Sequence, residues 1–181
     1  MVAAGYKWLC GPFGAAALFI NDRIRDRLEP SFVGWRSMLN AYYFEATRYD
    51  YNTGLKAWEF GTMSYAAGFA YGKALEYINN IGVENINKQA HKVSGYLMEQ
   101  LDAIGATVLS PREDHRRTGT VFIRFPGFDG EKVAARLNKN NVICSPRANG
   151  TRFSCHYFNN EADVDQAIET LKRVLAEMKA E

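Results

Sequence analysis

Hydrophobic and polar positions along this chain switch between the period of a strand and the period of a helix. A short apolar run follows a Gly-Pro-Phe-Gly turn and predicts a buried strand over residues 15–20. Apolar and polar residues alternate over residues 120–125, and shorter strands are predicted over 107–109, 142–145 and 152–156. Strand signals that alternate with helix signals are typical of an α/β chain.

Helical spacing is clearest in the middle of the chain and at its C-terminal end. Small residues dominate a predicted helix over residues 63–80, and a second helix follows over 83–104. Its apolar positions recur every three or four residues and are Ile86, Ala90, Val93, Leu97 and Leu101. Further helices are predicted over 129–138 and 161–179, and Asn160 is expected to cap the last one.

The order of these elements divides the chain into three parts. Residues 1–62 contain one strand and a long irregular stretch, residues 31–60, which is rich in aromatic residues and glycine. Residues 63–105 hold two helices that are predicted to bridge the flanking parts. Residues 106–181 carry the order β-β-α-β-β-α, which predicts a compact α+β domain. Long ordered loops often serve function, so residues 31–60 are a candidate region for a site.

Charge and cysteine content exclude several classes of function. The net charge is only +2 and the basic residues are spread along the chain, so we expect no nucleic-acid partner. No apolar run is long enough for a membrane span, and the first ten residues lack the layout of a signal peptide, so we expect a cytoplasmic protein. Cys10, Cys144 and Cys155 form neither a disulfide framework nor a zinc motif, and no metal site is expected.

One lysine has an unusual setting. Residues 5–14 read Gly-Tyr-Lys-Trp-Leu-Cys-Gly-Pro-Phe-Gly, which places Lys7 between two aromatic residues and just before a turn. A lysine that forms a Schiff base needs an unprotonated amine, which partial burial and cationic neighbours supply. On composition alone, a solvated lysine that extends past aromatic rings is the commoner case.

This segment resembles the cofactor-lysine motif of the class V aminotransferases, which are enzymes of PLP-dependent fold type I. In that family His or Tyr precedes the lysine, and Trp-Leu-x-Gly-Pro-x-Gly follows it. The resemblance implies that Lys7 forms the Schiff base with pyridoxal 5'-phosphate (PLP) and then moves the Cα proton of the substrate. It also implies that Tyr6 binds the cofactor phosphate, although plain packing is the alternative for this side chain.

Residues 58–65, Trp-Glu-Phe-Gly-Thr-Met-Ser-Tyr, are similar to a second family element, Glu-Phe-Gly-Thr-Pro-x-Tyr. Gly61 and Thr62 precede a helix, and free N–H groups at a helix start favour anions, although a simple helix cap is the commoner meaning of this pair. The resemblance implies that Gly61 and Thr62 contact the cofactor phosphate of a neighbouring subunit. It therefore implies a homodimer with composite sites.

Residues 151–165 resemble a third family element, in which an arginine on a strand is followed by an aromatic-Asn helix start. The guanidinium fork of arginine matches a carboxylate, and the resemblance implies that Arg152 binds the α-carboxylate of an amino-acid substrate. A surface salt bridge is the commoner alternative. Arg147 is a weaker candidate for approach to the substrate. Phe-Val-Gly-Trp at residues 32–35 is also similar to the family. Trp35 and Arg36 are expected to line the active-site mouth, with packing in the core as an equal alternative for Trp35.

The resemblance implies a fold of mixed α/β and α+β type. It consists of a remnant of the PLP-transferase large domain (1–62), bridging helices (63–105) and a complete small C-terminal α+β domain (106–181). The family's cofactor lysine follows most of the large domain, so we expect a fragment that binds PLP poorly by itself and has little activity.

The reaction implied is transamination, epimerisation or elimination at the Cα of an amino acid. A fragment of a cysteine desulfurase or selenocysteine lyase is the runner-up, because the loop before Arg152 is short and lacks the cysteine that those enzymes carry there. A non-catalytic dimerisation or interaction remnant is the third possibility, and an exposed apolar face would support it.

Overall fold

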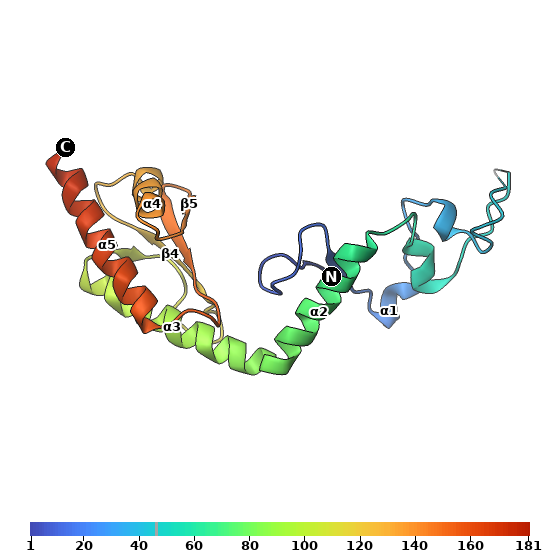
Figure 1. Ribbon diagram of the computed structural model, residues 1–181, viewed down its shortest axis with the longest axis horizontal. Coiled ribbons are helices and arrows are strands. Elements are labelled where there is room, and N and C mark those ends of the chain that lie inside the picture. The colour runs from blue at the N-terminus through green and yellow to red at the C-terminus, as the bar shows by residue number, and fades with distance from the viewer. Residues whose placement is uncertain (46) are drawn as a thin grey trace. The chain divides into compact units, whose positions relative to one another are not determined.

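The computed structural model describes residues 1–45 and 47–181, and the chain divides into two compact units, residues 1–80 (unit 1) and 81–181 (unit 2) (Figure 1). Each unit is described by itself. The three-part division expected from the sequence stays a prediction. Within the described residues, no helix has both the length and the apolar content that a membrane span requires.

Unit 1 contains little regular structure apart from one long helix. Its elements are β1 (Val2–Ala4), β2 (Ala16–Leu18), α1 (Asp22–Arg25), the 3-10 turns η1 (Trp35–Ser37) and η2 (Gly54–Trp58), and α2 (Tyr65–Ile81). β1 and β2 form a two-stranded antiparallel sheet with Ala3 opposite Ala17. The irregular segment predicted over residues 31–60 is therefore confirmed, with two short 3-10 turns inside it.

The predicted strand over 15–20 forms at residues 16–18, but the prediction that it is buried is wrong. All three residues of β2 are exposed, and within the predicted range only Ile20 is buried. The reason is that β2 pairs with β1 alone in its sheet, so an apolar composition does not place it inside a core.

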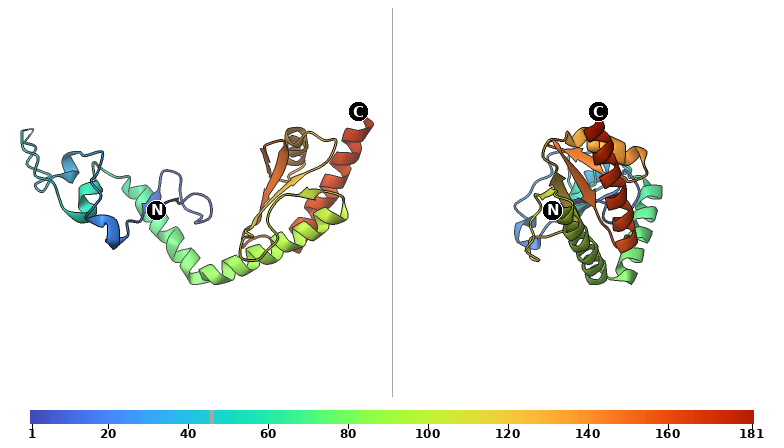
Figure 2. Two further views of the ribbon diagram at one scale, coloured as in Figure 1. Left: turned by 180° about the vertical axis from the view of Figure 1, so that it is seen from behind. Right: turned by 90° about the vertical axis from the view of Figure 1, so that its left-hand side faces the viewer.

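Unit 2 has the order that the sequence predicts, β-β-α-β-β-α after a long helix. Its elements are α3 (Val83–Ala103), β3 (Thr107–Val108), β4 (Thr120–Arg124), α4 (Gly130–Lys139), β5 (Ser145–Arg147), β6 (Gly150–Ser154) and α5 (Glu161–Ala180). The four strands are antiparallel in the order β3-β4-β6-β5. Residues of all three helices share one core cluster with inward residues of β4 and β6, so the helices cover one face of the sheet (Figure 2).

The predicted apolar positions of α3 are all buried. Leu101 packs in one cluster with Ile123 of β4, Leu137 of α4 and Leu171 of α5, and each of these side chains is fully buried. The last helix begins where expected, because the Asn160 side chain accepts a hydrogen bond from the Asp163 N–H and the Asp163 carboxylate accepts one from the Asn160 N–H. Periodicity and capping therefore predict this half of the molecule well.

The last two strands, β5 and β6, are shifted from their predicted places. The predicted strands over 142–145 and 152–156, with a loop between them, are observed as 145–147 and 150–154. The two strands are joined by a tight turn at Ala148 and Asn149, whose φ values are 40° and 58°. A two-residue hairpin needs positive φ at both central positions. Pro146 is tolerated because β5 lies at the edge of the sheet.

Candidate active-site residues

Lys7 lies in the loop that joins β1 to β2. The Gly5 N–H donates to the Ala15 carbonyl at 2.9 Å, which extends the pairing of the two strands by one residue. Inside the loop, the Gly11 N–H donates to the Gly5 carbonyl at 2.8 Å and the Cys10 N–H donates to the Lys7 carbonyl at 3.0 Å. The backbone that carries Lys7 is thus closed at its base and tightened by a turn of its own.

Two glycines hold this loop against α2. A Cβ on Gly5 would lie 2.5 Å from Tyr71 Cε2, and a Cβ on Gly11 would lie 2.9 Å from Tyr71 Cδ2. Both distances are shorter than side chains tolerate, so only glycine permits the loop to lie this close to the buried Tyr71 ring. The two glycines of the sequence motif thus allow the Lys7 loop to lie directly against the Tyr71 side chain of α2.

The Lys7 side chain is exposed, so the partial burial expected for a Schiff-base lysine is absent from this structure. Its Nζ lies 5.2 Å from the centroid of the Tyr6 ring, a cation–π arrangement, and the Tyr6 ring stacks on Phe13 with centroids 4.9 Å apart. Among the described residues, no carboxylate forms an ion pair with Lys7. Tyr6 and Lys7 are brought together, and the amine is accessible to a small molecule.

Gly61 and Thr62 precede α2 within unit 1. Open space surrounds the position of a Cβ on Gly61, and Thr62 is exposed. The capping interaction of the helix comes instead from Ser64, whose hydroxyl accepts a hydrogen bond from the Ala67 N–H at 3.4 Å. The simple capping role considered for the Gly61–Thr62 pair is therefore filled by another residue.

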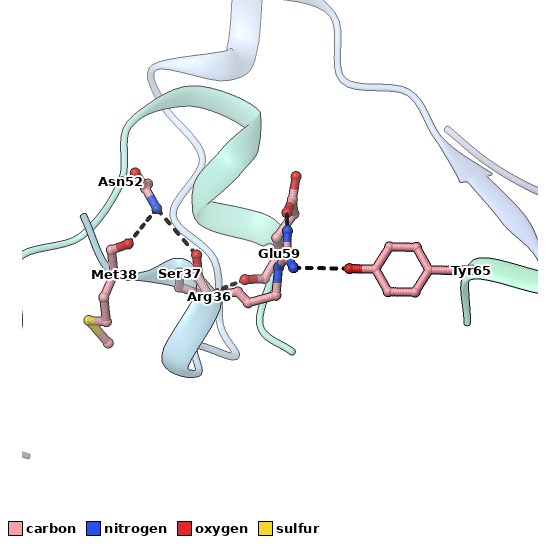
Figure 3. Close-up of polar contacts among 6 residues, drawn as sticks. All are labelled: Arg36, Ser37, Met38, Asn52, Glu59 and Tyr65. Carbon is pink, nitrogen blue, oxygen red and sulfur yellow. Dashed lines mark hydrogen bonds and ion pairs between the residues drawn. The ribbon is translucent and has the colours of Figure 1, made fainter. Parts of the chain in front are cut away.

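A polar network that the sequence did not reveal positions the approach to Gly61 (Figure 3). Arg36 Nη2 lies 3.0 Å from Glu59 Oε2, and Arg36 Nη1 lies 3.5 Å from the Tyr65 hydroxyl. The hydrogen bond to Glu59 raises the pKa of the Arg36 guanidinium above its ordinary value. Two residues that flank the Gly61–Thr62 turn, Glu59 and Tyr65, are thereby joined through one arginine.

The backbone of the same network is held by the buried hydroxyl of Ser37 and the half-buried side-chain amide of Asn52. The fully buried Ser37 hydroxyl donates to the Glu59 carbonyl at 3.2 Å and accepts from the Gly34 N–H at 3.2 Å. The Asn52 side-chain amide donates to the carbonyls of Arg36 and Met38 at 3.2 and 2.7 Å. Apart from the local bond between Gly34 and Ser37, the partners lie 14 to 22 residues apart in sequence, so no local sequence pattern predicts these contacts.

Trp35 is half-buried and lines a hollow in unit 1. Its ring contacts Tyr42 and Phe44, with centroids 5.5 and 5.8 Å apart. Trp35 and Phe44 border a cavity of about 380 Å³ together with Tyr43. Packing of Trp35 in a core is therefore not observed, and its place at an active-site mouth stays a prediction.

Arg152 lies on β6 of unit 2. Its neighbours in sequence, Thr151 and Phe153, are buried on the helix-covered side, so the Arg152 side chain leaves the opposite face of the sheet. Its Nε is buried without a hydrogen-bond partner in the described part of the chain, and no ion pair with a described carboxylate involves it. The surface salt bridge considered as the commoner alternative is therefore not observed.

The three cysteines differ sharply in environment. Cys144 and Cys155 are buried, and burial raises the pKa of each thiol to about 11, so neither resembles an activated nucleophile. Cys10 is exposed on the Lys7 loop. The described residues contain no cluster of three side chains able to hold a metal ion.

We expect one thiol of the native chain to react readily with an aromatic disulfide reagent at pH 8, and all three to react after denaturation. At that pH the thiolate fraction of a group with a pKa of about 11 is on the order of one thousandth. Raising the pH toward 11 should speed the two slow thiols by about tenfold per unit. The matched control is Cys10→Ser, which should remove the fast phase alone. Two or more fast thiols in the native chain would contradict the burial of Cys144 and Cys155.

Comparison with known proteins fits the fold and these motifs. The chain matches the family Aminotransferase class-V over residues 1–167. It is 24% identical to a probable cysteine desulfurase of Pyrococcus abyssi, with 98% of this chain and 47% of the relative covered. It is 27% identical to the uncharacterized aminotransferase YcbU of Bacillus subtilis, with 94% of this chain and 44% of the relative covered.

A solved structure supports the fold independently of the sequence matches. The apo cysteine desulfurase from Thermococcus onnurineus NA1 superimposes with a TM-score of 0.87 at 23% identity, over 97% of this chain and 46% of that one. This chain belongs to the class V aminotransferase family and has the fold of the PLP-dependent transferases. It spans somewhat less than half the length of the relatives that it matches.

Proposed function

We propose that this chain forms part of an enzyme that uses pyridoxal 5'-phosphate to act at the Cα of an amino acid. The observation that carries the proposal is the Lys7 loop. The loop presents an exposed amine that has no ion pair among the described residues and lies beside an aromatic ring. Gly5 and Gly11 allow the loop backbone to lie directly against Tyr71 of α2. Membership of the class V aminotransferase family supports the cofactor.

The residues present suit the cofactor at three points. The Lys7 amine is accessible to an aldehyde, the Tyr6 phenol lies next to it, and the Gly61–Thr62 segment offers an exposed hydroxyl and a glycine in open space. We propose that Tyr6 binds the phosphate group in one subunit, and that Gly61 and Thr62 bind it from a second copy. PLP supplies an electron sink that makes the Cα proton of a bound amino acid acidic.

The chemistry of this chain's own residues then follows. The Lys7 amine accepts the Cα proton of the substrate and returns it, which is general base and then general acid catalysis. The Arg152 guanidinium holds the α-carboxylate, since its Nε has no partner in the described protein and the open face of the sheet is available to a ligand. Arg152 orients the substrate and takes no proton itself.

Transamination, epimerisation or elimination fits the residues better than persulfide chemistry. Several relatives are probable cysteine desulfurases, which keeps that activity as the runner-up. Two features oppose it: the turn before Arg152 consists of Ala148 and Asn149 without a cysteine, and both neighbouring thiols are buried. A thiol with a raised pKa is a poor nucleophile for sulfur abstraction.

Exchange of the Cα proton in deuterium oxide tests the proposal without a choice of reaction, because all three reactions share that step. The chain mixed with PLP and an L-amino acid should exchange the proton slowly but faster than PLP alone, as followed by proton NMR. Lys7→Arg should return the rate to that of PLP alone, whereas Lys73→Arg should leave it unchanged. Equal rates with wild-type chain and with Lys7→Arg would refute the role of Lys7.

A non-catalytic interaction module is the second candidate, and one observation favours it. Unit 1 exposes many large apolar side chains, an arrangement associated with interaction surfaces. The most exposed are Met1, Phe13, Phe32, Tyr42 and Phe69. This candidate predicts no exchange that depends on Lys7, so the same experiment separates the two.

A further inference from the structure

The sheet of unit 2 carries three arginines on the face that its helices leave open. Ile123 and Phe153 are buried in the core, so their sequence neighbours Arg124 and Arg152 emerge on the opposite face. Arg147 belongs to the same face, since its register partner on β6 is Gly150, two residues from Arg152 along the strand.

The register makes Arg152 a near neighbour of the other two arginines. Arg152 lies directly opposite Phe122 on one side and Ser145 on the other. Arg124 follows Phe122 by two residues on β4, and Arg147 follows Ser145 by two residues on β5. Both are therefore diagonal neighbours of Arg152, at positions about 7–8 Å away in a sheet of ordinary geometry. Between them stands Gly150, which has no side chain.

The arginine group lies beside an aromatic ring, and hydrogen bonds to backbone carbonyls hold two of its side chains. Arg124 Cζ lies 5.9 Å from the centroid of the Phe122 ring, and Arg124 Nη2 donates to the Ala148 carbonyl at 2.7 Å. Arg147 Nη1 donates to the Pro146 carbonyl at 3.1 Å. These bonds use carbonyl oxygens and leave the positive charges uncompensated.

No acidic group of the described protein neutralises this face. The four strands contain no aspartate or glutamate, and none of the ion pairs between described residues includes any of the three arginines. The acids of the loop between β3 and β4, Glu113 and Asp114, pair with Arg116 and Arg117. Three unpaired guanidinium groups on one face favour a ligand with more than one negative charge.

The arrangement suits separated carboxylates better than a phosphate. A phosphate site commonly adds the free N–H groups of a helix N-terminus. The start of α4 adjoins this turn, but its N–H groups are already used: Gly130 donates to Asn149 Oδ1, and Glu131 and Lys132 donate to Asp129 Oδ1. The available donors are therefore the three planar guanidinium groups, which are spaced along the sheet. Each of them can bind one carboxylate.

We propose that the substrate is an acidic amino acid, with Arg152 on its α-carboxylate and Arg124 and Arg147 on the carboxylate of its side chain. The proposal rests on the role proposed above for Arg152. It assigns Arg124 and Arg147 as the residues that determine specificity. The Phe122 ring provides the surface for the methylene groups between the two carboxylates.

Competition between small acids tests this on the full chain, at constant ionic strength because charge pairs are screened by salt. NMR titrations of the arginine Nε–H signals would compare succinate, propionate and sulfate. We expect succinate to bind about tenfold more tightly than propionate. Arg124→Gln and Arg147→Gln should each remove most of that preference, because they weaken succinate binding more than propionate binding. Arg152→Gln should weaken both acids, Arg124→Lys should retain part of the preference, and Lys139→Gln is the charge-matched control away from this face.

Three results would overturn the inference. They are a succinate preference that survives both glutamine variants, equal binding of succinate and propionate to the wild-type chain, and sulfate binding as tight as succinate binding, which would mark a general anion surface. If Arg152→Gln alone has no effect, the proposed role of Arg152 fails as well. The exchange experiment on Lys7 uses a different signal, so the proton chemistry can stand when this inference falls.

Discussion

Gly34→Ala should unfold the network around Arg36 and the turn that follows it. A Cβ at this position would lie 2.0 Å from the Phe60 carbonyl oxygen and 3.0 Å from its carbon, so backbone rather than a flexible side chain must move. Gly34 has an ordinary extended conformation, which leaves this clash as the cause of the damage. We expect a loss of stability on the order of 3 kcal/mol, at the upper end for overpacking.

Tryptophan fluorescence during urea unfolding measures the effect in the right place. All three tryptophans, Trp8, Trp35 and Trp58, belong to unit 1. Gly72→Ala is the matched control, because open space surrounds that position inside α2 and alanine stabilises helix interiors by up to about 1 kcal/mol relative to glycine. Wild-type stability in Gly34→Ala would show that the contact between residues 34 and 60 is not as close as described.

Leu171→Ala should destabilise unit 2 by about 2–5 kcal/mol. Leu171 is fully buried in the cluster formed by the three helices and the sheet, so its truncation leaves a cavity that the neighbours fill only in part. Lys172→Ala on the same helix is the control, because this exposed side chain forms an ion pair with the exposed Glu169, its one ionic partner in the described part of the chain. Far-UV circular dichroism during urea unfolding gives the comparison. A similar midpoint for the two variants would exclude Leu171 from the core.

The sequence predicts the parts of the fold that depend on repeating local patterns. The apolar positions of α3 recur at helical spacing and all are buried, and Asn160 caps α5 as its sequence context indicates. The strand over 120–125 was also predicted within one residue. In each case the sequence signal, either a periodic pattern of apolar residues or a capping residue, involves residues that are close together in the chain.

What the sequence does not predict depends on distant partners or unusual backbone. The turn at Ala148 and Asn149 needs two positive φ values, and alanine gives no sign of one, so the flanking strands were misplaced. The prediction that β2 is buried is wrong, because an apolar composition does not reveal how many strands pair with β2.

The candidate site divides in the same way. The motifs around Lys7, the Gly61–Thr62 pair and Arg152 are contiguous and can be recognised in sequence. The link between Arg36 and Glu59 spans 23 residues of irregular chain, and the grouping of Arg124 with Arg147 depends on the register of three strands. Such groupings appear only once the chain is folded.

Covalent capture by PLP tests whether the Lys7 amine can carry the cofactor. The chain would be incubated with PLP, reduced with borohydride and digested, and the labelled lysines would be quantified by mass spectrometry. We expect weak, substoichiometric labelling that falls chiefly on Lys7, because the Tyr6 ring lies beside its amine and Tyr6 is proposed to bind the cofactor phosphate. Inorganic phosphate should reduce the labelling of Lys7. Labelling of Lys7 no greater than that of Lys73 and Lys92, and insensitive to phosphate, would contradict it.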